Sequence, residues 1–148
     1  MITIFKNFNE VGENKPLPTI LEEIKTGKYK PGIIYLRKSL AEKKEEAYNK
    51  AKKSLPAFTP SGKFIGGRKL EFLTEYSNFI ILDIDKLSAT ELQKAKNLAA
   101  QSEFTYACFV SPSGNGLKIL VKIETHIDWP NALHFANHLH LICRCLKL

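Results

Sequence analysis

The chain has 148 residues, the length of one folded domain, and we expect residues 1–148 to form a single domain. Hydrophobic residues make up 44% and charged residues 25% of the sequence, a globular composition that excludes a disordered chain. The formal net charge of +7 favours polyanionic partners such as nucleic acid and nucleotides. Most of this excess lies in residues 1–55, which carry 12 basic and 7 acidic side chains.

No part of the sequence directs the chain into a membrane or out of the cell. No apolar run approaches the ~20 residues of a membrane span. The N-terminal residues MITIFKNFNE lack the basic and apolar regions of a secretory signal. The three cysteines have no metal-type spacing. We therefore expect a cytoplasmic protein with no membrane partner.

The first half of the chain predicts one strand and two helices. Residues 2–8 alternate in polarity and predict a strand. A short helix is predicted to begin at Pro18 and to end at Gly27. The pattern of residues 32–53 predicts one longer helix whose lysines and glutamates form a solvated face. Residues 55–68 are rich in Pro, Ser and Gly and predict turns between short extended segments.

The second half alternates strands and helices. Strands are predicted over residues 78–85, 104–110 and 117–123, and helices over residues 87–101 and from Asp128 onward. Ser88 and Glu91 have the spacing of a capping box at the start of the first of these helices. This order favours an α+β fold, with a mainly antiparallel or mixed sheet and helices packed on one face.

The strand over residues 78–85 carries two aspartates on one face. Side chains two residues apart point to the same side of a strand, so Asp83 and Asp85 follow Phe79 and Ile81 on one face. Two carboxylates at this spacing can converge on a divalent cation. The alternative is that they only cap a strand end in solvent or pair with lysines. Asp-x-Asp alone does not decide between these interpretations.

The strand over residues 117–123 places Lys118, Leu120 and Lys122 on one face and only apolar residues on the other. If the apolar faces of both strands meet the same helices, the aspartates and these lysines share the open side of the sheet. A surface with a metal ion and ammonium groups suits the phosphates of a nucleotide or a nucleic acid.

The loop between the last two strands has the sequence SPSGNG, residues 111–116. Its small residues, hydroxyls and backbone N–H groups allow a phosphate to approach closely. It is not a Walker A loop, because no Gly-Lys-Ser/Thr follows and a strand comes next. The alternative is a simple hairpin turn, since Asn-Gly between two β-rich runs is a strong hairpin signal, and both interpretations can hold together.

Together these motifs resemble the archaeo-eukaryotic primase superfamily, the primase–polymerase fold. The resemblance rests on the strand that ends in IILDID, residues 80–85, followed by a helix, a strand and residues 111–118. With the upstream stretch LPAFTPSGKFIGGRK, residues 55–69, the chain looks most like one particular domain. That domain precedes virulence-associated protein E-type helicase domains in mobile elements of Bacteroides-like bacteria. The similarity covers roughly residues 30–140 and implies an RRM-like core.

The resemblance implies roles for particular residues. The metal ligands for Mg²⁺ or Mn²⁺ would be Asp83 and Asp85, and the catalytic set would add Lys118. Lysines would neutralise phosphate charge, and basic residues near the glycines would contact a nucleic-acid backbone. The nucleotide pocket would comprise Ser111, Ser113, Gly114, Gly116, Lys118 and Lys122, and the nucleic-acid contacts Lys63 and Arg68. The implied partners are a nucleoside triphosphate, nucleic acid with DNA favoured, and a helicase-type P-loop ATPase.

Two departures from the family pattern lower the expected activity. Lys118 stands where many members have a phosphate-contacting histidine, and lysine does not reproduce imidazole geometry. The third acidic residue of primase-type enzymes, which follows the last helix, has no counterpart, so we expect a domain shortened at its C-terminus. We therefore expect weak or no nucleotidyl transfer. The alternatives are a non-catalytic nucleic-acid-binding or adaptor module and an interaction fragment without a ligand.

Overall fold

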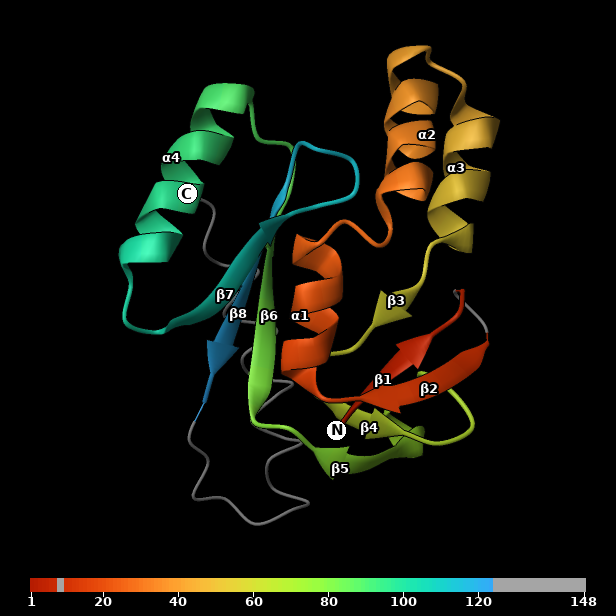
Figure 1. Ribbon diagram of the computed structural model, residues 1–148, viewed down its shortest axis with the longest axis vertical. Helices are drawn as coiled ribbons and strands as arrows, with labels where there is room; N and C mark the ends of the chain where they lie inside the picture. Colours follow the sequence, from red (N-terminus) through yellow and green to blue (C-terminus); the bar gives the residue numbers. More distant parts are fainter. Residues whose placement is uncertain (8–9, 124–148) are drawn as a thin grey trace.

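The computed structural model describes residues 1–7 and 10–123. In this part of the chain, four α-helices accompany eight strands, so the predicted α+β class is confirmed (Figure 1). The helices are α1 (Leu17–Lys25), α2 (Lys30–Ala41), α3 (Glu45–Ser54) and α4 (Ala89–Gln101). The strands are β1 (Ile2–Phe5), β2 (Val11–Lys15), β3 (Ala57–Phe58), β4 (Gly62–Phe64), β5 (Leu73–Tyr76), β6 (Phe79–Ile84), β7 (Thr105–Val110) and β8 (Leu117–Lys122).

The strands form three sheets in which every pairing is antiparallel. Their orders are β2–β1–β3, β4–β5 and β6–β8–β7. In the third sheet β8 lies between β6 and β7, so the crossover through α4 joins two parallel strands that are not neighbours. This sheet contains both motifs that the sequence singled out, the Asp-x-Asp strand and the strand that begins after the SPSGNG loop.

Helix α1 joins the first and third sheets. The buried side chains of Leu17 and Ile20 pack with Ile2 and Ile4 of β1 and with Leu120 of β8. The helix begins next to Pro18, and Gly27 adopts a φ of 79° just after the C-cap, as the sequence predicted. Burial of these apolar groups is what holds the two sheets together.

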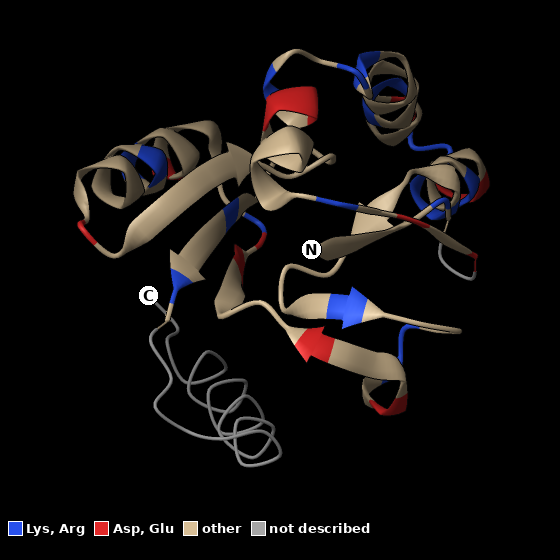
Figure 2. Cartoon of the chain, turned by 60° about the horizontal axis from the view of Figure 1, so that its bottom comes forward, with Lys and Arg blue, Asp and Glu red and all other residues tan. Residues whose placement is uncertain are grey.

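The third sheet is covered on both faces, which corrects the expectation of helices on one face. Helix α1 packs against the face that carries Phe79, Ile81 and Leu120. Helix α4 contacts β7 and β8 from the opposite side (Figures 1 and 2). The physical reason is that Phe79 and Ile81 expose too much apolar surface to face water, so α1 buries them. Polar side chains lie on this face at its two ends, Asp83 and Lys118 at one and Lys122 at the other.

The single helix predicted over residues 32–53 is wrong, because the segment forms two helices that fold back on each other. Helices α2 and α3 are joined at Lys43, whose φ of 54° is left-handed. The amide of Lys44 donates to the carbonyl of Ser39 at 2.9 Å and satisfies the end of α2. Folding back allows the two helices to pack together and buries Leu36 and Ala51.

The remaining predictions agree with the structure where it describes them. The capping box of α4 is present, with the Ser88 hydroxyl accepting from the Glu91 amide and the Glu91 carboxylate accepting from the Ser88 amide. The helix predicted from Asp128 lies outside the described residues. Of the helices that the structure describes, none is both long and apolar enough to cross a membrane.

Candidate functional site

An aspartate pairs with a lysine at one polar end of the third sheet, which is the alternative to a metal site that the sequence left open. Asp83 and Lys118 are direct neighbours in the register of β6 and β8. The Lys118 ammonium donates to Asp83 Oδ2 at 2.5 Å. The Asp83 side chain is 45% exposed and the Lys118 side chain is 25% exposed, so the pair is open to solvent and not enclosed beneath a helix. The two groups therefore lie on the same face of the sheet.

Asp85 lies against the SPSGNG loop, one residue beyond β6. A Cβ atom at Gly116 would stand 2.9 Å from Asp85 Oδ1 and 2.9 Å from the Ser111 hydroxyl. It would also stand 2.8 Å from the carbonyl oxygen of Ile84, closer than real contacts allow. Gly116 therefore permits the loop and the aspartate to meet. The hydrogen bond from the Leu87 amide to the Asn115 carbonyl, 2.8 Å, fixes the same junction.

The SPSGNG loop is a tight hairpin turn with an ordered set of hydroxyls. The Ser111 amide donates to the Gly116 carbonyl at 2.8 Å and closes the turn, and Gly114 adopts a φ of 88°. The Ser111 and Ser113 hydroxyls are 3.0 Å apart, and Ser113 donates to the Asn115 side chain at 2.6 Å. The prediction of a hairpin turn is confirmed, and the Ser111 hydroxyl and Asp85 Oδ1 both lie next to Gly116.

Arg37 of α2 contacts this loop, a contact that no local pattern in the sequence indicates. Its Nε donates to the Pro112 carbonyl at 3.0 Å, and its Nη2 donates to the Ser111 carbonyl at 3.4 Å. The guanidinium also lies against Gly114, where a Cβ atom would stand 3.2 Å from Nε. Arg37 thus ties the α2–α3 pair to the loop across 75 residues of sequence, a distance at which no local motif is visible.

A single cavity of about 860 Å³ brings most of the predicted site residues together. We call it the central cavity, and it lies between the α2–α3 pair and the third sheet. Its charged and hydroxyl-bearing lining includes Lys30, Lys52, Arg68, Asp83, Asp85, Ser111, Ser113 and Lys118. Its aromatic lining includes Tyr29, Tyr48, Phe58, Tyr76, Phe79 and Phe109. The volume lies within the ~300–1,000 Å³ of small-molecule sites.

Four of the ten predicted site residues do not line the central cavity: Gly114 and Gly116 of the loop, Lys63 and Lys122. Lys122 is paired with Phe79 at the far end of β8 from Lys118 and does not line the cavity. Lys63 faces Glu75 across the β4–β5 pair and does not line it either. Arg68 does line it, and its guanidinium lies 5.1 Å from the ring centroid of Phe5.

The oxygen ligands at the two aspartates suit a hard divalent cation such as Mg²⁺, which also coordinates water and phosphate oxygens. Asp83 and Asp85 supply carboxylate oxygens, and the Ser111 hydroxyl lies beside Asp85. Among residues 1–7 and 10–123, no group of three or more His, Cys, Asp or Glu side chains gathers in a metal-binding arrangement. Mg²⁺ is commonly held by only one or two carboxylates together with water and substrate phosphates. The residues present fit that pattern.

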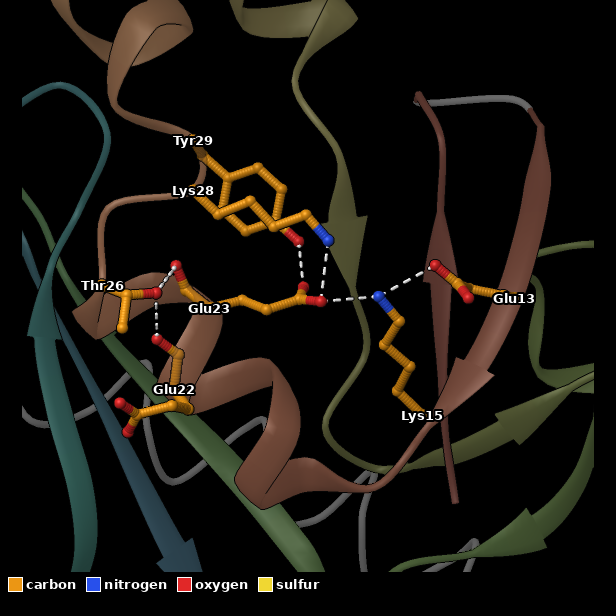
Figure 3. Close-up of polar contacts among 7 residues, drawn as sticks. All are labelled: Glu13, Lys15, Glu22, Glu23, Thr26, Lys28 and Tyr29. Carbon is orange, nitrogen blue, oxygen red and sulfur yellow. Dashed lines mark hydrogen bonds and ion pairs between the residues drawn. The ribbon is translucent and has the colours of Figure 1, made fainter.

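A second polar cluster fixes the wall of the central cavity at the junction of α1 and α2 (Figure 3). The Glu23 carboxylate accepts from the Lys15 and Lys28 ammonium groups, both at 2.7 Å, and from the Tyr29 hydroxyl at 2.6 Å. These donors hold the pKa of Glu23 at about 2. Burial, and then the bond to Glu23, raises the pKa of Tyr29 to about 12. The cluster therefore holds Tyr29 where its side chain lines the cavity.

Comparison with known proteins assigns the chain to a family. A family model described as BT4734-like, N-terminal domain, matches residues 50–140. The matched segment includes the Asp-x-Asp strand, α4 and the SPSGNG loop. No curated protein and no solved structure gives a significant match. Because the matched residues make up more than half of the chain, the protein belongs to the BT4734-like N-terminal domain family.

Proposed function

We propose that this domain binds the metal-bound polyphosphate of a nucleotide or a nucleic acid, as a primase–polymerase-like domain of a mobile element would. The observation that carries the proposal is the meeting of Asp83, Asp85 and Lys118 in one cavity beside a Ser-Gly loop. Carboxylates hold the cation, and an ammonium group balances phosphate charge, so both halves of such a ligand have a partner. A replication role and a helicase-type P-loop ATPase partner are part of the same proposal.

Each residue has a distinct part in this binding. Asp83 and Asp85 hold Mg²⁺ or Mn²⁺, which supplies charge neutralisation and Lewis acidity to the phosphates when bound. Lys118, which donates to Asp83, would instead pair with a phosphate oxygen of a bound polyphosphate. The turn closed by Ser111 and Gly116 presents small groups that let a phosphate approach. With lysine in place of histidine, we expect weak nucleotidyl transfer or none.

Calorimetric titration of a non-hydrolysable nucleoside triphosphate in Mn²⁺ tests the proposal. Asp83→Asn should abolish the Mn²⁺-dependent part of binding, because the amide is neutral and is a poorer metal ligand. Glu103→Gln is the matched control, since Glu103 is exposed and does not line the central cavity. Unchanged nucleotide binding by Asp83→Asn would reject the metal role.

A second candidate is a non-catalytic module that binds nucleic acid and positions a partner. The observation that favours it is the presence of Lys30, Lys52 and Arg68 in the lining of the cavity, in addition to Lys118. This candidate predicts salt-dependent binding of single strands that survives Asp83→Asn and does not require divalent ions. Loss of strand binding in EDTA would exclude it.

A further inference from the structure

Most of the net positive charge of the protein lies on the α2–α3 pair, residues 30–54, which we call the basic hairpin. It carries 8 Lys or Arg and 3 Glu, a net charge of +5 out of the +7 of the whole chain. All eight basic side chains belong to exposed residues. Figure 2 shows them recurring along both helices and their connection. Lys38 and Lys44 pair with Glu42, but Lys30, Lys50 and Lys53 have no carboxylate partner among the described residues.

Aromatic rings are interleaved with these lysines. Tyr35 of α2 is 57% exposed. Tyr48 of α3 lies under the Lys52 ammonium, 5.9 Å from its ring centroid, and both residues line the central cavity. Tyr29 and Lys30 line the same cavity at the start of α2. Surfaces that bind single-stranded nucleic acid combine lysines that contact the phosphate backbone with aromatic rings on which the bases stack.

The basic hairpin is continuous with the site. Arg37 bonds to the carbonyls of Ser111 and Pro112, so the hairpin and the SPSGNG loop are held together. Lys30 and Lys52 share the central cavity with Asp83. The hairpin and the site therefore share two basic residues, Lys30 and Lys52.

We infer that the cavity-facing side of the basic hairpin is the binding surface for a single-stranded nucleic acid, whose backbone contacts Lys30 and Lys52 and whose bases stack on Tyr48. A duplex does not fit this arrangement, since its bases are stacked on each other and are not available to side-chain rings. The inference builds on the proposed function by directing the strand toward the aspartates, and it can fail alone because strand binding is measured without divalent ions.

Fluorescence anisotropy of a labelled oligothymidylate, measured without divalent ions over a series of salt concentrations, tests the inference. Each lysine–phosphate contact to a single strand contributes about 0.7 to the slope of log affinity against log salt. Lys30→Gln with Lys52→Gln should therefore lower the slope by about 1.4 and weaken binding roughly 25-fold at 0.1 M salt. In the otherwise wild-type protein, Tyr48→Ala should also weaken oligonucleotide binding. Tyr48→Phe should bind like wild type, because phenylalanine keeps the stacking face.

Two lysines on α4 supply the matched control. Lys94 and Lys96 are exposed and lie on the other side of the third sheet, so Lys94→Gln with Lys96→Gln removes the same charge from a different surface. An equal loss in this control, or an unchanged slope in the Lys30 and Lys52 variant, would overturn the inference. Binding to phosphatidylserine vesicles with no binding to the oligonucleotide would also overturn it, in favour of a membrane surface.

The two proposals are separable in the same protein. Asp83→Asn should keep metal-free oligonucleotide binding while it loses Mn²⁺-dependent nucleotide binding. If wild-type protein binds the oligonucleotide but not the Mn²⁺ nucleotide, the proposed function fails and the basic hairpin stands. If it binds only the Mn²⁺ nucleotide, the basic hairpin is refuted and the proposed function stands.

Discussion

Replacing Lys118 with methionine should strengthen binding of a divalent cation alone and weaken binding of a nucleotide that carries the cation. The Lys118 ammonium donates to Asp83 Oδ2 at 2.5 Å. A divalent cation that arrives alone must break this pair. A cation that arrives with a polyphosphate offers the ammonium a new anionic partner. Lys118 therefore weakens binding of the free cation and strengthens binding of the cation–polyphosphate complex.

The size of both effects follows from the exposure of the pair. Two unit charges ~4 Å apart interact by about 4 kcal/mol at an effective dielectric constant of about 20. The side chains of Asp83 and Lys118 are 45% and 25% exposed, so solvent reduces the net value toward the ~1 kcal/mol of exposed pairs. Lys118→Met should then strengthen binding of Mn²⁺ alone about fivefold. It should weaken the Mn²⁺ nucleotide roughly 2- to 30-fold, because the loss of a charge-assisted hydrogen bond, ~1.5–3 kcal/mol, exceeds the ~1 kcal/mol that is no longer needed to break the pair.

The assay is a pair of titrations on each variant, one with Mn²⁺ followed by its electron paramagnetic resonance signal and one with the nucleotide in saturating Mn²⁺. Lys118→Arg keeps the charge and should follow wild type in the direction of both effects. If Lys118→Met weakens both ligands together, or changes neither, the exchange of Lys118 between carboxylate and phosphate is refuted.

Two further predictions concern the surroundings of the site. Gly116→Ala should destabilise the fold by ~1–3 kcal/mol in urea unfolding, because its Cβ would meet the Ile84 carbonyl at 2.8 Å; a loss below ~0.5 kcal/mol would show that the loop relaxes freely. Glu23→Gln should remove a pH-dependent stabilisation. The pKa of Glu23 is lowered to about 2, so its ionised carboxylate stabilises the wild-type fold above about pH 4.5. This stabilisation is lost as the pH falls toward 2. The difference in unfolding free energy between wild type and Glu23→Gln should therefore shrink over that window, and a constant difference would contradict the assigned cluster.

The sequence predicts the third sheet well because each of its elements has a strong local signal. Alternation places Asp83 after Phe79 and Ile81 on one face, and the register of β6 with β8 then sets Lys118 opposite Asp83. The capping residues Ser88 and Glu91 fix the start of α4. These features depend on neighbours in sequence, so pattern and structure agree.

Other features depend on contacts between distant segments and leave no local signal. Strand β2, Val11–Lys15, has no apolar alternation and forms because its backbone pairs with β1. The turn at Lys43 has no glycine, and packing of α2 on α3 selects it over a continuous helix. Arg37 reaches a loop 75 residues away. The cover that α1 gives to Phe79 and Ile81 is likewise a tertiary contact.

Anomalous diffraction from crystals grown with Mn²⁺ and a non-hydrolysable nucleoside triphosphate shows directly whether the aspartates hold the cation. We expect a manganese peak coordinated by carboxylate oxygens of both Asp83 and Asp85, with a phosphate oxygen bonded to the Lys118 ammonium. A nucleotide bound with Lys118 still paired to Asp83, or a manganese ion held at some other group of side chains, would contradict this expectation.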